Sequence, residues 1–355
     1  VAALRFRPPE YFDEHRITRI QGSATAIDRE RRELVLASGE RLAYEHLVLA
    51  TGARNRVPAV AGIELGGVFG LRNLADADGL SQRLGSAKRA VVIGAGFIGL
   101  EFAAVAAARG IAVDVLELGT RPMARALSAV TSQVFDHAHA RWGVRIHYGQ
   151  SLAAIHGDGG QVRSVELASG EVLPADLVVY GIGVLPNAEL AAQAQLTVNN
   201  GIVVDAHLLT SDPAISAIGD VVSFPSPWSP QAIRLESVQN AVDQAKAVAA
   251  RLMGKPAGYA ALPWFWTDQG ELKLQIAGLA DGHDETVVLG SVEQHQISVL
   301  CFRAGRLVAV ESCNRPADHM AARKLIARNT PLSPAEAAAP GFDLKAFEVS
   351  TRETA

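Results

Sequence analysis

The chain has 355 residues, 49% of them hydrophobic, and a formal net charge of −4. A chain of this length usually divides into two or three hydrophobic cores, and a slightly acidic protein without a stripe of Lys and Arg is not expected to bind nucleic acid. The two cysteines, Cys301 and Cys313, form no C-x-x-C pair, which argues against disulfide staples and against a redox-active dithiol.

The first predicted elements, in residues 33–52, recur later in the chain. Residues 36–40 and 167–171 both read Leu-Ala-Ser-Gly-Glu, and they lie 131 positions apart (167 minus 36). The match continues without a gap to Gly52 and Gly183. Each copy predicts two short strands around a Ser-Gly turn, followed by a buried strand that ends in glycine. An ungapped repeat favours two copies of one dinucleotide-binding domain over a chance pair of hairpins.

If both copies are the same domain, the first should carry a glycine fingerprint like the one that begins at Gly94 in the second. The matching position, 131 residues before Gly94, lies ahead of Val1, and the chain begins with Val rather than Met. We therefore expect the chain to lack the first strand–helix–strand unit of the first domain, including its glycine fingerprint.

The next predicted unit contains that fingerprint. Residues 91–101 read Val-Val-Ile-Gly-Ala-Gly-Phe-Ile-Gly-Leu-Glu, an apolar strand that leads through G-x-G-x-x-G into a helix. Gly94 permits a tight turn, Gly96 lets a pyrophosphate approach the backbone, and Gly99 lets the helix pack against the strand. The free N–H groups at the start of the helix favour a phosphate there. The alternative is a buried strand–helix–strand unit that binds no nucleotide.

A second strand follows this helix, which is expected to end at Gly110, and that strand ends at Glu117. Glu117 lies 23 residues after Gly94 (117 minus 94). This is close to the spacing of about 20 that is typical of the acid that binds a ribose 2′-OH. A carboxylate there repels a 2′-phosphate and favours NAD(H) over NADP(H), a preference that the nearby Arg121 and Arg125 weaken.

A later segment carries two features typical of a flavin site. Residues 214–220 predict a short strand that ends in Gly-Asp, where the Asp220 carboxylate can accept a polyol hydrogen bond or, alternatively, cap a turn. Residues 236–241 read Glu-Ser-Val-Gln-Asn-Ala and open a helix with Ser237 as its N-cap. Aimed at a flavin, this helix N-terminus would stabilise the charge of the reduced ring; the alternative is a plain core helix. The predicted apolar stripe of the helix comprises Val238, Ala241, Val242, Ala245, Val248, Ala249 and Leu252.

The C-terminal region predicts β-structure followed by one helix. Residues 333–355 are rich in Ala and Pro and are expected to form a loosely packed tail. The strand-like runs are 273–278, 286–289, 297–302 and 307–312, and the predicted helix spans 319–328.

Several of these motifs occur together in one family. The combination resembles the FAD-dependent ferredoxin reductases of the putidaredoxin and rhodocoxin reductase type, over essentially the whole chain. The family's N-terminal flavin fingerprint, its acid for the adenosine ribose and a lysine near the flavin are not in this chain. The motifs that carry the resemblance are the fingerprint, Ile-Gly-Asp at 218–220, Ala-Thr-Gly-Ala-Arg-Asn-Arg at 50–56, Glu-Ser-Val-Gln-Asn-Ala at 236–241 and Pro-Trp-Phe-Trp-Thr-Asp-Gln at 263–269, the last two being specific to this group.

This resemblance implies a function and a set of site residues. NADH would give a hydride to FAD, and single electrons would pass to a [2Fe–2S] ferredoxin that serves a monooxygenase or a dioxygenase. Trp266 would lie near the flavin, and Lys246 would contact the ferredoxin unless it only forms the polar face of its helix. Glu101 would lie near the nicotinamide amide or, alternatively, act as a first-turn carboxylate of its helix. The implied residues are Gly94, Gly96, Gly99, Glu101, Glu117 and Gly183 for NAD and Ala24, Thr51, Gly52, Arg72, Asp220 and Val238 for FAD.

The expected fold is α/β, with two Rossmann-like dinucleotide-binding domains, the first truncated at its N-terminus, and an α+β C-terminal domain. The alternative functions are a related reductase with another acceptor, such as rubredoxin, and an inactive NAD-binding fragment. We expect a cytoplasmic monomer or dimer. The expected parts are residues 1–60 and 186–258 for the FAD-binding domain, 61–185 for the NAD-binding domain, and 259–355 for the C-terminal interface domain.

Overall fold

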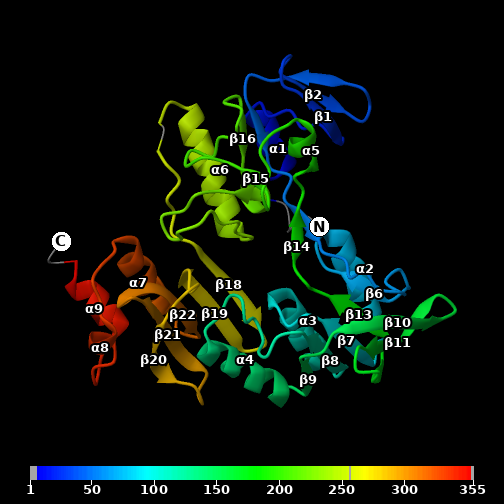
Figure 1. The fold of residues 1–355 in the computed structure, drawn as a ribbon, viewed down its shortest axis with the longest axis vertical. Helices are drawn as coiled ribbons and strands as arrows, with labels where there is room; N and C mark the ends of the chain where they lie inside the picture. The colour runs from blue at the N-terminus through cyan, green and yellow to red at the C-terminus, as the bar shows by residue number, and fades with distance from the viewer. Residues whose placement is uncertain (1–5, 256, 353–355) are drawn as a thin grey trace.

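The structure, a computed structural model, describes residues 6–255 and 257–352. Figure 1 shows three bodies: an upper body of blue and yellow-green segments, a lower-right body of cyan and green segments, and a lower-left body of orange and red segments. Strands β5 (Ala53–Asn55) and β14 (Val184–Pro186) pair antiparallel and form a narrow ribbon between the upper and lower-right bodies. None of the helices within the described residues is long and apolar enough to cross a membrane.

A five-stranded parallel sheet forms the centre of the lower-right body. Val91 and Ile93 face one side of the sheet, and Ala90 and Val92 face the other. Because both sides are covered, the central strands are apolar nearly throughout. Across the sheet the strands are β6 (Val68–Gly70), β13 (Leu177–Tyr180), β7 (Arg89–Ile93), β8 (Ala112–Glu117) and β9 (Val144–Tyr148). One side packs on α2 (Leu74–Leu84), α3 (Phe97–Ala108) and α4 (Ala129–Arg141), and the other on β10 (Leu152–Asp158), β11 (Gln161–Leu167) and β12 (Val172–Pro174).

The internal repeat is confirmed by matching hairpin geometry. Gly39 and Gly170 occupy the Ser-Gly turns, and each has a φ of +87°, a conformation that favours glycine. In both copies the leucine before the turn donates its N–H to the glutamate carbonyl after it, at 2.9 Å. The first copy is a three-stranded sheet of β1 (Ala24–Asp28), β2 (Glu33–Leu36) and β3 (Arg41–Ala43), which corresponds to β10, β11 and β12 in the second copy.

The upper body has its own core, built from residues on both sides of the inserted lower-right body. Strand β4 (Leu47–Leu49) pairs parallel with β16 (Ile215–Ala217), and both pack near α6 (Val238–Leu252). The remaining elements are α1 (Pro9–Glu14), α5 (Glu189–Gln193), β15 (Ile202–Val203), the short 3₁₀ helix η2 (Gly219–Val221) and β17 (Val222–Ser223).

The apolar stripe predicted for α6 is only partly the buried face. The buried row contains Gln239, Asn240, Gln244 and Val248, whereas Val238 and Leu252 are exposed. The expectation was wrong because polar side chains on this helix hydrogen-bond neighbouring backbone. The Gln244 side-chain carbonyl, for example, accepts the Gly219 N–H at 2.7 Å.

The C-terminal region folds as an antiparallel sheet backed by helices. One face of the sheet continues the core of α3 and α4, and the other packs on the terminal helices. The four predicted strands and the helix are present, but the edge strand β18 was not predicted. Residues 333–352 are not a loose tail, because Ala337 and Leu344 are fully buried against the sheet. In sheet order the strands are β18 (Trp264–Gln269), β19 (Leu272–Gly278), β22 (Arg306–Cys313), β21 (Gln296–Arg303) and β20 (Glu285–Ser291), and the helices are α7 (Pro316–Ala327), α8 (Pro334–Ala337) and α9 (Leu344–Ser350).

Candidate functional site

The glycine fingerprint forms the turn between β7 and α3. Gly94 has a φ of +98°, and a Cβ atom there would lie 2.7 Å from the Gly181 carbonyl oxygen. A Cβ on Gly99 would lie 2.2 Å from the Gly94 carbonyl oxygen, so only glycine allows this close packing. Gly96 is the N-cap of α3 and supplies no capping side chain. The first N–H groups of the helix can therefore bind an anion.

Glu117, the last residue of β8, is bonded to this turn. Its carboxylate accepts the Ala95 N–H at 2.8 Å and the Gly119 N–H at 2.7 Å. These two bonds fix the turn against the end of the neighbouring strand. Because a carboxylate offers about four lone-pair sites, a ribose hydroxyl can still donate to Glu117.

The Arg121 side chain, which we expected to weaken a preference for NAD(H), is bonded within its own loop. Its guanidinium donates to the carbonyls of Leu127 (2.8 Å) and Ala124 (2.9 Å) and to the Ser132 hydroxyl (2.6 Å). A guanidinium committed to three such partners stabilises the loop before α4 and is not free to neutralise a 2′-phosphate. Arg125 is exposed at the surface of the same loop.

Gly183 lies just beyond the carboxyl end of β13, next to the fingerprint turn. Strand β13 pairs with β7, and the Gly181 N–H bonds the Ile93 carbonyl at 2.8 Å. Gly183 has a φ of +98° and leads directly into the ribbon strand β14. The structure thus brings Gly183 to the edge of the sheet where the fingerprint lies, the edge at which parallel α/β sheets bind ligands.

Glu101 lies one turn into α3 and is half-buried against the C-terminal sheet. It is the fifth residue of the helix, so the expectation of a first-turn carboxylate was wrong. The Thr267 hydroxyl on β18 donates to Glu101 Oε1 at 2.5 Å. Burial raises the pKa of Glu101, and the Thr267 hydrogen bond opposes that rise.

A second cluster of expected residues forms where the upper body meets the lower-right body. Arg72 follows β6, Asp220 lies in η2, and their side chains form an ion pair at 2.9 Å. A Cβ on Gly52, which has a φ of +64°, would lie 3.7 Å from the Arg72 guanidinium. Thr51 is fixed beside it, because its hydroxyl donates to the Asn187 carbonyl at 2.7 Å.

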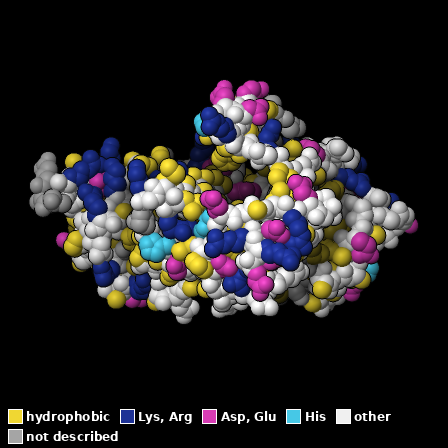
Figure 2. Space-filling view, turned by 90° about the horizontal axis from the view of Figure 1, so that it is seen from above, with side chains coloured by type: hydrophobic (Ala, Val, Ile, Leu, Met, Phe, Trp, Pro, Cys, Tyr) yellow, Lys and Arg dark blue, Asp and Glu magenta, His cyan; other side chains and the backbone are white. Residues whose placement is uncertain are grey.

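The first turns of α6 lie beside η2, which carries Asp220 of this cluster. Ser237 is the predicted N-cap, since its hydroxyl accepts the Asn240 N–H at 3.1 Å. Val238, the first helical residue, is 56% exposed. One turn later the helix lies against η2, where a Cβ on Gly219 would be 3.6 Å from the Ala241 side chain. Seen from above, Figure 2 shows a recess in the surface with an acidic side chain at depth, bordered by hydrophobic groups.

Strand β18 carries two tryptophans beside this junction. The Trp264 and Trp266 rings stack with centroids 5.7 Å apart, and the Trp266 side chain is 45% exposed. The Arg323 guanidinium covers the Trp264 ring at 4.5 Å. The backbone N–H of Trp264 donates to the side-chain oxygen of Gln239 on α6 at 3.2 Å, so Trp264 lies at a contact between the upper body and the C-terminal sheet.

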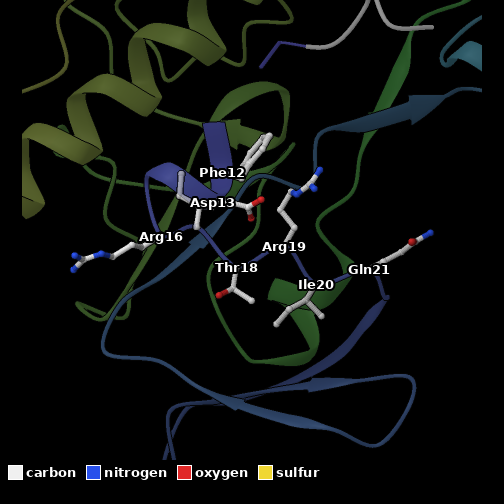
Figure 3. Close-up of a pocket in the computed structure, with 8 residues that line it drawn as sticks. Phe12, Asp13, Arg16, Thr18, Arg19, Ile20 and Gln21 are labelled. Carbon is white, nitrogen blue, oxygen red and sulfur yellow. The ribbon is translucent and has the colours of Figure 1, made fainter. Parts of the chain in front are cut away.

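Ala24 lies apart, at the start of β1, and the segment before it lines an open pocket (Figure 3). In this pocket the Arg19 guanidinium lies over the Phe12 ring at 4.6 Å. Figure 3 shows the lining side chains pointing in different directions rather than toward one centre, so they form no catalytic cluster. The pocket is lined by Phe12, Asp13, Arg16, Ile17, Thr18, Arg19, Ile20 and Gln21.

The cysteines and the acidic groups offer no further redox or metal chemistry in the described part of the chain. Cys301 and Cys313 are fully buried free thiols. Burial raises the pKa of both, that of Cys313 to about 12, so neither is a reactive thiolate at neutral pH. Within the described residues, His, Cys, Asp and Glu side chains form no group of three or more that could hold a metal.

Comparisons with known proteins agree with this arrangement. Residues 6–245 match the pyridine nucleotide-disulphide oxidoreductase family, and residues 264–348 match the reductase C-terminal family. The chain is 50% identical over 344 residues to rhodocoxin reductase of Rhodococcus erythropolis, a match that covers 97% of this chain and 81% of that protein.

Two solved structures are also similar. The ferredoxin reductase for the CYP199A2 system from Rhodopseudomonas palustris has a TM-score of 0.96 at 49% identity, covering 98% of this chain and 86% of that chain. The reductase in the covalent putidaredoxin reductase–putidaredoxin complex also has a TM-score of 0.96, at 36% identity, covering 100% of this chain and 86% of that chain.

Proposed function

The chain belongs to the pyridine nucleotide-disulphide oxidoreductase family, and we propose that it passes electrons from NADH through FAD to a [2Fe–2S] ferredoxin that serves a monooxygenase or a dioxygenase. It is an FAD-dependent NAD(P)H:ferredoxin reductase. One observation carries the proposal. Strand β18 is hydrogen-bonded both to α3, which follows the glycine fingerprint, and to α6, which packs against the η2 segment that carries Asp220.

The residues at the upper junction fit FAD. Asp220 offers a carboxylate to a ribitol hydroxyl, and Arg72 offers a guanidinium beside it. The Val238 N–H at the start of α6 would be a donor to the flavin ring, and the positive end of the helix dipole would stabilise negative charge there. Thr51 and Gly52 form the turn beneath Arg72, and Ala24 is assigned to the same cofactor through its backbone. Bound FAD supplies the conversion of a two-electron hydride into two one-electron transfers, which an iron–sulfur acceptor requires.

On the nucleotide side, the task of the protein is to position NADH. The turn at Gly94, Gly96 and Gly99 binds the pyrophosphate, and Glu117 accepts the ribose 2′-hydroxyl hydrogen bond. Glu101 and Gly183 border the nicotinamide end. Hydride transfer needs no general acid or base, so these residues contribute geometry and exclude water.

We place the docking surface for the acceptor near the exposed Trp266, where the Arg323 guanidinium over the neighbouring Trp264 ring supplies positive charge that would steer an acidic ferredoxin. Lys246 on α6 is 74% exposed and lies 3.7 Å from Asp243, a weak surface pair that leaves it available. Figure 2 shows further basic side chains gathered at the C-terminal end of the molecule. There, three cations surround the single carboxylate of Glu348, namely those of Lys324, Arg328 and Arg352.

A visible absorption spectrum of the purified chain, before and after anaerobic NADH, tests the function. A flavin band that bleaches with NADH, followed by reduction of an added [2Fe–2S] ferredoxin, is the expected result. Bleaching with transfer only to rubredoxin would assign another acceptor. No flavin band after reconstitution with FAD would contradict the proposal and favour an NAD-binding fragment.

The matched variant for this test is Asp220→Asn, which keeps the shape of the side chain and removes its charge. We expect it to lose flavin while NAD⁺ binding is retained.

We further propose a cytoplasmic location and the four-part division into residues 1–60, 61–185, 186–258 and 259–355.

A further inference from the structure

Strand β18 presents two different faces because its side chains alternate. Trp264 and Trp266 lie on the face that carries the stacked rings. Phe265 and Thr267 lie on the opposite face, toward α3, where the Phe265 ring meets Phe97 edge-on at 5.2 Å. One strand of the C-terminal sheet therefore packs directly on the helix that follows the glycine fingerprint.

The contact between Thr267 and Glu101 is short and shielded. Thr267 is 1% exposed, and its hydroxyl donates to Glu101 Oε1 at 2.5 Å. The Thr267 hydroxyl is therefore a donor from β18 that holds the Glu101 carboxylate. A carboxylate has about four acceptor sites, which leaves capacity for a donor from a ligand.

The direction of the Thr267 hydroxyl is fixed from behind. Gln269 donates its amide N–H to Thr267 Oγ1 at 3.2 Å, which leaves the hydroxyl hydrogen to point at Glu101. The Gln269 amide is itself oriented, since its oxygen bonds His139 Nε2 at 2.8 Å and its nitrogen lies 3.7 Å from Met123 Sδ. Burial lowers the pKa of His139, and the amide oxygen of Gln269 can only accept, so His139 Nε2 is the donor of this bond.

The chain of contacts returns to the fingerprint turn. The Met123 N–H donates to the Ala95 carbonyl at 2.9 Å, and Ala95 lies between Gly94 and Gly96. The buried amide of Gln269 thus connects two parts of the site. Through Thr267 it contacts the Glu101 carboxylate, and through Met123 it contacts the fingerprint turn. This is an arrangement for holding Glu101 at a set distance from the turn.

We propose that Thr267 is a positioning residue that holds the Glu101 carboxylate, through one oxygen, so that it accepts a hydrogen bond from the carboxamide of the nicotinamide. The inference rests on the proposed function, which assigns the nicotinamide end to Glu101. It adds that the C-terminal sheet, and not only the nucleotide-binding body, determines recognition of the nicotinamide.

The test compares NAD⁺ with ADP-ribose, which has the same pyrophosphate and adenosine but no nicotinamide. Binding is measured by isothermal titration calorimetry for the wild type and for Thr267→Val, Thr267→Ser and Thr286→Val. The last is a matched control on β20, at the opposite edge of the same sheet. We expect Thr267→Val to bind NAD⁺ about tenfold more weakly and ADP-ribose within about twofold of the wild type, because the Glu101 carboxylate is no longer held in place at the nicotinamide end while the pyrophosphate turn is unchanged.

Thr267→Ser keeps the hydroxyl and should restore NAD⁺ binding to within about threefold of the wild type. In a Glu101→Ala background, Thr267→Val should cause no further loss, because the residue acts through Glu101. Thr267→Ala replaces the valine variant if that variant does not fold.

Equal weakening of NAD⁺ and ADP-ribose, or no weakening of either, would overturn the role of Thr267. A full effect of Thr267→Val in the Glu101→Ala background would also overturn it. If the wild type itself binds neither NAD⁺ nor NADH, the proposed function fails instead, so the two failures are distinguishable.

Discussion

Replacing Glu117 with Gln tests coenzyme preference, because the amide keeps the size of the side chain and removes its charge. The carboxylate is held by the N–H groups of Ala95 and Gly119, so it stays at the position that we propose for the ribose. The Arg121 guanidinium is already bonded to Leu127 and Ser132. A 2′-phosphate therefore meets the charge of Glu117 without compensation from Arg121.

The size of the effect follows from Coulomb's law. A phosphate with about two negative charges at about 5 Å from a carboxylate in water is repelled by about 2 kcal/mol. The amide has a single oxygen, so it accepts the N–H of Ala95 or of Gly119 but not both. It also accepts a weaker hydrogen bond from the ribose of NADH, a loss of about 1 kcal/mol. Glu117→Gln should therefore lower the ratio of kcat/KM for NADH to kcat/KM for NADPH. The two effects together are about 3 kcal/mol, which is on the order of 100-fold.

The assay is steady-state reduction of ferredoxin with each coenzyme in turn, at constant ionic strength. Glu171→Gln is the matched control, because Glu171 is exposed at the turn of the second repeat copy, and it should leave the ratio unchanged. An unchanged ratio in Glu117→Gln would refute the assignment of Glu117 to the ribose.

Three further outcomes follow from buried groups. Gly99→Ala places a Cβ 2.2 Å from the Gly94 carbonyl oxygen, which must shift the fingerprint turn. NAD⁺ binding measured by calorimetry should weaken by at least about tenfold while flavin content is unchanged. Normal NAD⁺ binding would contradict the packing argument. Glu311 accepts the N–H and O–H of Ser128, and burial raises its pKa in the folded protein. The contribution of Glu311 to stability is therefore fully present below the pKa of the unfolded chain and is lost as pH rises through the pKa of the folded protein. The Tm of Glu311→Gln relative to wild type should therefore increase between pH 5 and pH 8, and a constant difference would count against this. Cys313, fully buried with its pKa raised to about 12, should not react with a chromogenic disulfide reagent in the folded protein, and blocking reagents should leave NADH oxidation intact.

The parts of the site that could be predicted are those set by local spacing. Gly94, Gly99 and Glu117 belong to one strand–turn–helix–strand unit, so their separation along the chain determines their separation in space. The same holds for Ser237 as a helix N-cap, whose partner is three residues away. The repeat could be found because each hairpin is formed by residues close together in the sequence, so the same short motif occurs around Gly39 and Gly170.

The missed parts depend on how separate bodies pack. Thr267 and Glu101 are 166 positions apart, and their contact follows only once the C-terminal sheet is placed on α3. Strand β18 was missed because an aromatic run next to a proline gives no clear period of two. The hydrogen bonds of Arg121 within its own loop could not be predicted either. A charged side chain next to a binding motif is easily taken for a ligand-binding group until its partners in the fold are known.

The ribbon of β5 and β14 has a consequence for the origin and engineering of the molecule. Asn55 and Val184 are direct ladder partners, so the chain leaves the upper body and re-enters it at adjacent positions. A module inserted in this way can be exchanged between hosts without altering the host's geometry, because its two ends already meet. The apolar side of its helices shares one core with the C-terminal sheet, however. A transplanted segment 56–183 therefore needs that sheet to cover its apolar surface. Grafts that carry both pieces should remain folded, whereas grafts of the inserted segment alone should aggregate.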